Sequence, residues 1–372
     1  MKAGCLFLVG LLALAAALGL LAGLGALRPT APPPPRPSPA PRVEPGPEPL
    51  PESYKEWVDS LHEFRQWEWG GRYSVGYGFI DHHGRPHQMS CSIERAAHER
   101  ELAGYGYDEA EIDRIADARV RQYLEQELAQ RGLSAYVRVK VERGRTSAES
   151  EVPSMAADEH ARIEAEIKRF YALWDGAIAR KREAIEKPLY KERGFLLENH
   201  RVSPDYTGLA LQGGPALADC FRALGEAGQG YNPRQYLGLF VGFFQEIRYE
   251  LPPDLIQGRR TLGVFVPTEV LVNDHGDCDS KSVAFAALYR NLGSPVLLIE
   301  LSHHVLIGAE MRPGPGEKYV LVDNRYYVIG EVAGPGKRRP GDASHDVWNE
   351  ISGHFRYTVV PAADQGFTRS SR

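Results

Sequence analysis

A cysteine, a histidine and a carboxylate, the residue types that acyl-transfer chemistry combines, occur in that order late in this chain. Asp277 is a good helix N-cap and Gly293 a helix stop, so Cys278 is expected in the first turn of a helix. The backbone N–H groups and the dipole at that position favour a thiolate. The carboxylates of Asp277 and Asp279 oppose it, so an activated thiol would need an imidazolium nearby.

The histidine and the acid are expected on strands that follow this helix. His304 opens an apolar strand, and Asp323 ends the next one after a turn near Pro313 and Gly314. A thiolate can attack a carbonyl while histidine moves the proton and an acid orients the imidazole. If the two strands form a hairpin, His304 and Asp323 are cross-strand neighbours. Glu331, one strand further on, would fall at the opposite end of the sheet, so this geometry favours Asp323.

Each of these residues also has a non-catalytic interpretation. A lone buried cysteine at a helix start is usually a small core residue, and a lone histidine on an apolar strand is usually structural. A zinc site formed by Cys278, His304 and His275 is a further reading, but it falls short of the usual ligand requirements. We therefore expect no metal and no cofactor.

The residues around the cysteine resemble a known motif. The segment 276–282 (Gly-Asp-Cys-Asp-Ser-Lys-Ser), continuing through 286–293, is similar to the cysteine motif of the transglutaminase-like superfamily. Segments 244–249 and 267–271, and His304 ahead of Val-Leu-Ile-Gly308, resemble a bacterial and archaeal branch of it. The resemblance covers roughly residues 205–335. It implies a papain-like α+β core with Cys278 as nucleophile and His304 as base.

The third member of the triad is ambiguous under this resemblance. The superfamily places an aromatic residue, three further residues and then Asp at the end of the last active-site strand. Tyr319 to Asp323 and Tyr327 to Glu331 both have this spacing, whereas the branch favours a Tyr-Tyr-x-x-x-Glu context, as in 326–331. Asp323 is ranked first and Glu331 is kept as its alternative.

A side-chain donor for an oxyanion hole would complete such a site. Gln245 lies upstream in the right order to act with the backbone N–H of Cys278. The ordinary alternative is a glutamine on a helix surface. His303 is a weaker alternative to His304, because His304 alone occupies the motif position.

The N-terminus predicts a membrane anchor. Residues 3–27 carry no charge and are long enough to span a bilayer, so residues 1–27 are expected to form a signal-anchor or, alternatively, a cleaved signal peptide. Residues 28–51 then form a proline-rich extended spacer. The flanking arginines argue by the positive-inside rule for a cytoplasmic body. The short N-terminal tail before the apolar run favours export, to the periplasm or cell surface.

The soluble body is expected to be α+β and to divide near residue 200. Residues 52–200 form a mixed helical and hairpin domain of unknown role, 201–360 the transglutaminase-like domain, and 361–372 a loose tail. Strands are expected at 73–80, 85–93 and 136–141, a helix at 109–131, and one long helix at 155–187 ending before Pro188. In an oxidising compartment Cys91 and Cys220 can pair, leaving Cys278 as the odd thiol.

Composition narrows the function. With 44 basic and 49 acidic residues the net charge is −5, so nucleic acid is not an expected partner. We predict a membrane-tethered, thiol-dependent acyl-transfer enzyme, a cysteine peptidase or transamidase, acting on a protein or peptide. The alternative is a non-catalytic scaffold of the same fold in the cell envelope. The sequence leaves the substrate, the acyl acceptor and the oligomeric state open.

Overall fold

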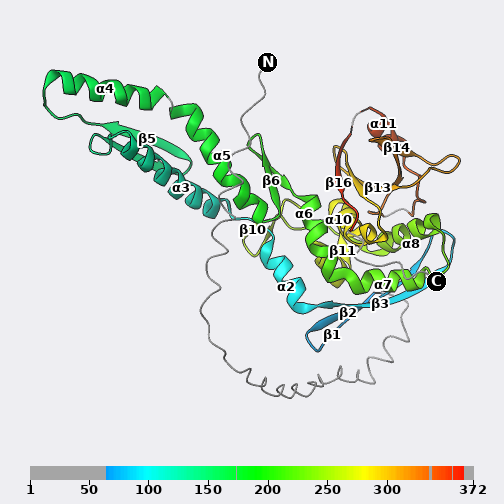
Figure 1. Ribbon diagram of the computed structural model, residues 1–372. Helices are drawn as coiled ribbons and strands as arrows, with labels where there is room; N and C mark the ends of the chain where they lie inside the picture. Colours follow the sequence, from blue (N-terminus) through cyan, green and yellow to red (C-terminus); the bar gives the residue numbers. More distant parts are fainter. Residues whose placement is uncertain (1–63, 173, 335–336, 354, 364–372) are drawn as a thin grey trace, which may run out of the picture. The chain divides into compact units, whose positions relative to one another are not determined.

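The computed structural model describes residues 64–172, 174–334, 337–353 and 355–363 (Figure 1). The chain divides into two units, Met1–Leu50 and Pro51–Arg372, and the described residues belong to the second. The predicted anchor (1–27), the spacer (28–51) and most of the tail lie outside the described residues. Within the described ranges, no helix combines the length and the apolarity that a membrane crossing requires.

The chain alternates helices with short strands, most of which pair in an antiparallel manner. The helices are α2 (Arg95–Gly104), α3 (Glu109–Gln130), α4 (Ala157–Ala172), α5 (Trp174–Glu192), α6 (Tyr206–Gly213), α7 (Ala218–Ala227), α8 (Pro233–Glu246), α9 (Pro267–Asn273), α10 (Cys278–Tyr289) and α11 (His345–Gly353), with 3₁₀ turns η1 (Gly214–Leu217) and η2 (Arg290–Leu292). The strands are β1 (Arg65–Trp69), β2 (Arg72–Ile80), β3 (Pro86–Glu94), β4 (Val137–Glu142), β5 (Arg145–Ser150), β6 (Phe195–Glu198), β7 (Arg201–Pro204), β8 (Arg248–Tyr249), β9 (Leu255–Ile256), β10 (Arg259–Arg260), β11 (His275–Gly276), β12 (Val296–Glu300), β13 (Val305–Glu310), β14 (Tyr319–Val322), β15 (Arg325–Gly330) and β16 (Arg356–Val360). The predicted α+β class is confirmed.

Helix α10 lies at the centre of the largest core. Its residues from Ser280 to Tyr289 are buried, and it packs against α6, α8, α9 and the strands β12 and β13 (Figure 1). A helix that is buried on all sides is apolar all round instead of along one stripe. This burial explains why most residues of α10 are small or apolar. Asp277 caps it by accepting a hydrogen bond from the Ser280 N–H at 3.0 Å. The predicted cap and helix are confirmed.

A curled antiparallel sheet covers α10, with strand order β14-β15-β13-β12-β16. The strand residues alternate between two faces. One face, which includes Leu298, Ile307 and Val328, joins the α10 core. The other face, which includes Leu297, Leu306 and Ile329, packs with Ile351 of α11. The expected hairpin between the strands that carry His304 and Asp323 is wrong, because β15 lies between β13 and β14.

The N-terminal strands share the same core. Val75 of β2 and Ile93 of β3 are fully buried in the cluster that contains Phe244 and Phe285. The predicted pairing of Cys91 with Cys220 is present as a disulfide that joins β3 to α7. The core therefore draws on residues from both sides of position 200.

A second hydrophobic cluster lies within residues 120–185. It is formed by α3, α4, α5 and the β4–β5 hairpin, and Ile163, Ile167 and Phe170 form an apolar stripe of α4 that is buried in it. The helix predicted over 155–187 corresponds to α4 and α5, with residue 173 between them outside the described residues. Its predicted end before Pro188 is wrong, because Pro188 lies inside α5. A proline inside a helix removes its own N–H donor and its ring crowds the carbonyl four residues earlier, but helical residues can continue on both sides of it.

Candidate active site

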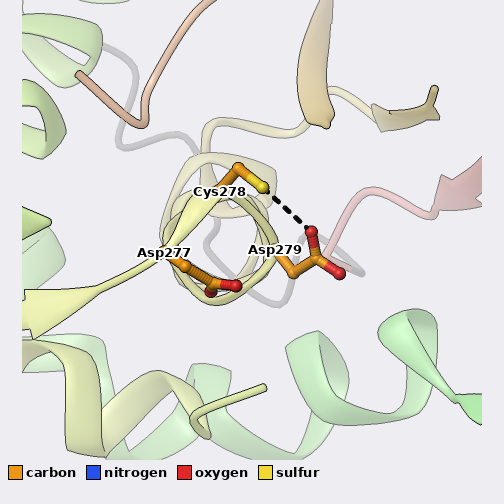
Figure 2. Close-up of side chains that lie close together, drawn as sticks. All are labelled: Asp277, Cys278 and Asp279. Carbon is orange, nitrogen blue, oxygen red and sulfur yellow. Dashed lines mark hydrogen bonds between the residues drawn. The ribbon is translucent and has the colours of Figure 1, made fainter. Parts of the chain in front are cut away.

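Cys278 occupies the first position of α10 and is 8% exposed. Its Sγ donates a hydrogen bond to Oδ1 of Asp279 at 3.2 Å, and Figure 2 shows the sulfur turned towards that carboxylate while Asp277 points elsewhere. The backbone N–H of Val305, the first residue of β13, acts to lower the pKa of this thiol. The thiol is thus held between the tip of a helix and the start of the strand that His304 precedes.

His304 is paired with Glu331. The imidazole Nε2 lies 2.5 Å from Oε2 of Glu331, and both side chains are largely buried. The other carboxylate oxygen, Oε1, accepts a hydrogen bond from the Ala333 N–H at 3.0 Å. The carboxylate is therefore fixed at both oxygens, and one of them orients the imidazole.

Strand register explains why Glu331 reaches His304 and Asp323 does not. Ile307 of β13 pairs with Gly330, so Glu331 leaves β15 beside the start of β13. A Cβ on Gly330 would meet Cδ1 of Ile307 at 2.6 Å, so a larger residue here would require the Ile307 side chain to shift. Asp323 sits exposed in the β14–β15 turn with φ 49°, at the far end of β15. The ranking of Asp323 ahead of Glu331 as the partner of His304 is wrong.

The electrostatics leave the resting sulfur protonated. Burial raises the pKa of the Cys278 thiol, the charge of Asp279 adds to this, and the Val305 N–H opposes it only in part. Burial alone would lower the pKa of His304, but the hydrogen bond and charge of Glu331, together with the charge of Asp279, raise it. The thiol therefore stays protonated at rest, and the imidazole of His304 is more readily protonated than its burial alone would allow.

Asp279 is shared between two donors. Its Oδ1 accepts from the Cys278 thiol, and its Oδ2 accepts from the Tyr206 hydroxyl at 2.5 Å. Burial, followed by the charge of Asp279, raises the pKa of Tyr206, so this tyrosine stays a donor. Tyr206 was not identified in the sequence, where nothing marks a tyrosine 72 residues upstream of the cysteine.

Gln245 does not serve as an oxyanion donor in this arrangement. Its Nε2 donates to the backbone oxygens of Glu331 at 2.5 Å and of Arg338 at 3.0 Å, which uses both amide hydrogens. Its Oε1 is buried and has no partner among the described residues. The predicted oxyanion role is therefore corrected, because the amide holds the segment that carries the acid.

Lys281 supports the same segment from α10. It is fully buried, and its Nζ donates to the backbone oxygens of Ala333, at 3.0 Å, and of Ile247. Burial lowers its pKa to about 8. The sequence carries a signal for this role, because a lysine within an otherwise small and apolar helix must find buried partners.

Tyr249 flanks the thiol on the solvent side. Its strand β8 runs parallel to β11, so that Tyr249 pairs with Gly276, two residues before the cysteine. The ring is 51% exposed. Burial raises the pKa of its hydroxyl, and the charges of Cys278, Asp277, Asp279 and Glu331 add to this. The approach to the sulfur is therefore acidic and carries an exposed aromatic side chain.

The side chains of Cys278, His304 and His275 do not come together as a zinc site. Among the described residues, the one group whose ligand atoms lie within 4.8 Å of one another is Asp277, Cys278 and Asp279 (Figure 2), which contains no imidazole. Asp277 is already used by the Ser280 N–H and hydroxyl as a helix cap. His275 is turned to Glu269, at 3.2 Å, and its ring stacks on Phe265. These residues do not form a ligand set that zinc prefers.

Comparisons with protein-family models, with curated proteins and with solved structures each find no match to this chain. The resemblance to the transglutaminase-like superfamily therefore stays a prediction. What the site can do has to be argued from its own geometry.

Proposed function

We propose that this protein is a thiol-dependent acyl-transfer enzyme, a cysteine peptidase or transamidase, in which Cys278, His304 and Glu331 act together. The observation that carries the proposal is the 2.5 Å contact between His304 and Glu331 just before β13, whose first backbone N–H acts to lower the pKa of the Cys278 thiol. A nucleophile, a base and an orienting acid are thus gathered from α10, β13 and the end of β15.

The contact also suggests how the imidazole works. Because Glu331 engages Nε2, the proton of the neutral ring is expected on that nitrogen, and Nδ1 is left to accept a proton. His304 would take the thiol proton as the sulfur bonds to the substrate carbonyl carbon. The carbon–nitrogen bond would then break, with that proton passing to the leaving amine. Water or an amine would release the acyl group from the thioester in a second step.

A raised thiol pKa is compatible with this scheme under one condition. The proton must leave during attack, with His304 acting as general base, because a thiolate does not accumulate beforehand. The backbone N–H of Cys278, in the first turn of α10, is available by position to stabilise the developing oxyanion.

The proposal extends to fold and location. A buried helix that begins with cysteine and packs on an antiparallel sheet bearing the histidine and the acid supports a transglutaminase-like core. The Cys91–Cys220 disulfide supports an oxidising, extracytoplasmic location, since such bonds persist there. The anchor over residues 3–27 would tether the body to the membrane, and the substrate would be a protein or peptide.

A second function, a non-catalytic scaffold, is favoured by the burial of the thiol. Cys278 is only 8% exposed, and its hydrogen bond to Asp279 stabilises the protonated form. In that case the fold would present a binding surface, and the three residues would have only a structural role.

Alkylation by iodoacetamide separates the two functions. Cys278 is the free cysteine among the described residues, so its modification can be located by peptide mass spectrometry. For the enzyme, His304→Ala should slow alkylation at pH 7.5 by at least about tenfold, because the base that takes the proton is lost. His303→Ala, at the adjacent position, is the matched control and should leave the rate unchanged. Equal rates in all three proteins would favour the scaffold.

A further inference from the structure

A large open cavity lies away from the thiol, between helix α3 and the β4–β5 hairpin. It has a volume of about 1370 Å³. One wall is a face of α3 that carries Arg114 and Arg121, with Ala110 and Ala118 providing room between them. The opposite wall is the tip of the hairpin, with Arg143 and Arg145. Four arginines therefore line one open cavity.

The two walls are held together by specific contacts. Asp117 of α3 accepts a hydrogen bond from the Gly144 N–H at 3.2 Å, and Arg121 donates to the Val141 backbone oxygen at 3.0 Å. Glu142 pairs with Arg145 across a two-residue turn, Arg143-Gly144, in which both residues have positive φ. Such a turn fixes the hairpin geometry. The arginines are thus presented by a braced framework.

The acidic residues of the cavity are already paired with basic side chains. Asp113 and Asp117 both bind the guanidinium of Arg182, at 2.6 Å and 2.5 Å. Glu142 pairs with Lys140 at 3.2 Å. By contrast, the guanidinium groups of Arg114, Arg143 and Arg145 have no hydrogen-bond or ion-pair partner within the described part of the chain. The cavity therefore carries a surplus of positive charge, although the whole chain has a net charge of −5.

We propose that this cavity binds an elongated ligand that carries several phosphate groups. Guanidinium groups match phosphate oxygens in a bidentate manner, and arginines on two facing walls suit anionic groups spaced along a ligand. The volume exceeds what a single phosphate would fill. The described lining contains no aromatic side chain on which nucleobases could stack, which argues against a nucleic acid. The ligand is thus recognised through its phosphates.

Titration calorimetry of the full-length protein with sodium tripolyphosphate tests the proposal. Wild type should bind, and the double variant Arg114→Ala/Arg145→Ala should bind at least about tenfold more weakly, because charge-assisted contacts are lost from both walls. Raising the salt concentration should weaken wild-type binding. The matched control is Arg119→Ala/Arg138→Ala, which removes exposed arginines from α3 and β4 outside the cavity and should bind as wild type does.

Vesicles distinguish a soluble phosphate ligand from a lipid headgroup. Wild type and the double variant are compared on phosphatidylglycerol and on phosphatidylcholine vesicles, so that any contribution of the rest of the chain cancels. A loss confined to phosphatidylglycerol assigns the phosphates to a membrane surface, and a loss with tripolyphosphate alone assigns them to a soluble ligand. Equal binding by wild type and double variant in every arm overturns the proposal, as does stronger competition by poly-glutamate than by tripolyphosphate.

Discussion

The amide of Gln245, on α8, donates to the backbone oxygen of Glu331 at 2.5 Å, while the side chain of the same glutamate binds His304. Lys281, three residues after the cysteine, donates to the backbone oxygen of Ala333, which is two residues after Glu331. The segment that carries the acid is thus held through its backbone by two buried donors. One of these donors belongs to the helix that bears the thiol, so the positions of nucleophile and acid are coupled.

Replacing the carboxylate of Glu331 should impair the site, whereas replacing that of Asp323 should not. Glu331→Gln keeps the size of the side chain but removes the charge that raises the pKa of His304. We expect alkylation of Cys278 to slow on the order of 10²-fold. Its pH profile should shift to lower pH, because the imidazole loses its proton more easily. Asp323→Asn, in the exposed turn, should match wild type, and the reverse ranking of the two variants would contradict the assignment.

Lys281→Met should destabilise the protein and slow alkylation at the same time. The substitution leaves the backbone oxygens of Ile247 and Ala333 without their donor in a fully buried position. An unsatisfied buried acceptor costs about 1–3 kcal/mol, and relief of the buried ammonium offsets part of this. We expect a net loss of about 2 kcal/mol in the free energy of unfolding, measured by urea denaturation.

The control for Lys281→Met is Lys187→Met on α5. That lysine is exposed and pairs with Glu183 of its own helix, so the change should stay within about 0.5 kcal/mol. A Lys281→Met protein that is destabilised but alkylated at the wild-type rate would show that the clamp on the Glu331 segment does not serve the site.

Opening the disulfide should destabilise the fold strongly. Cys91 and Cys220 are 129 residues apart in sequence, and the bond joins β3 to α7 within the main core. In the chain-entropy account, closing a loop of this length stabilises a protein by about 4–5 kcal/mol. The double variant Cys91→Ala/Cys220→Ala should therefore unfold at a markedly lower urea concentration. The same midpoint for variant and wild type would mean that the bond is not formed in solution.

Much of the site could be predicted from the sequence because its signals are local. A capping Asp277, a stop at Gly293 and a small, apolar segment between them specify α10 and place Cys278 at its start. Strand order is not local. Tyr319 and Leu321 of β14 are apolar although they are 39% and 56% exposed. In sequence β14 therefore resembles a central strand, although it lies at the edge of the sheet. Sequence spacing alone therefore suggested a β13–β14 hairpin and the wrong acid.

The role of Gln245 was missed for a related reason. A glutamine side chain can donate to a reaction intermediate or to a backbone carbonyl, and its sequence position is the same in both cases. Only the path of the segment after Gly330, which brings the backbone oxygens of Glu331 and Arg338 to α8, decides between them.

Because Glu101 is buried, we expect the free energy of unfolding to fall as the pH rises towards neutrality. This glutamate of α2 accepts hydrogen bonds from the N–H and hydroxyl of Thr268, and its Oε1 is buried without a partner among the described residues. Burial raises its pKa from 4.5 to about 7, against the bonds from Thr268 that lower it. The folded state therefore holds a proton that the unfolded state releases, and stability decreases as the pH rises from 4.5 to 7.

The size of the effect follows from the pKa shift, at about 1.4 kcal/mol per unit, so Glu101 accounts for a loss of about 3 kcal/mol over this window. Glu101→Gln cannot ionise, and its free energy of unfolding should fall less between pH 5 and pH 8 than that of wild type. Glu99→Gln, an exposed position on the same helix, should keep the wild-type slope. Parallel slopes for Glu101→Gln and wild type in urea denaturation would show that Glu101 is already ionised at pH 5, and that the buried oxygen has a partner in solution.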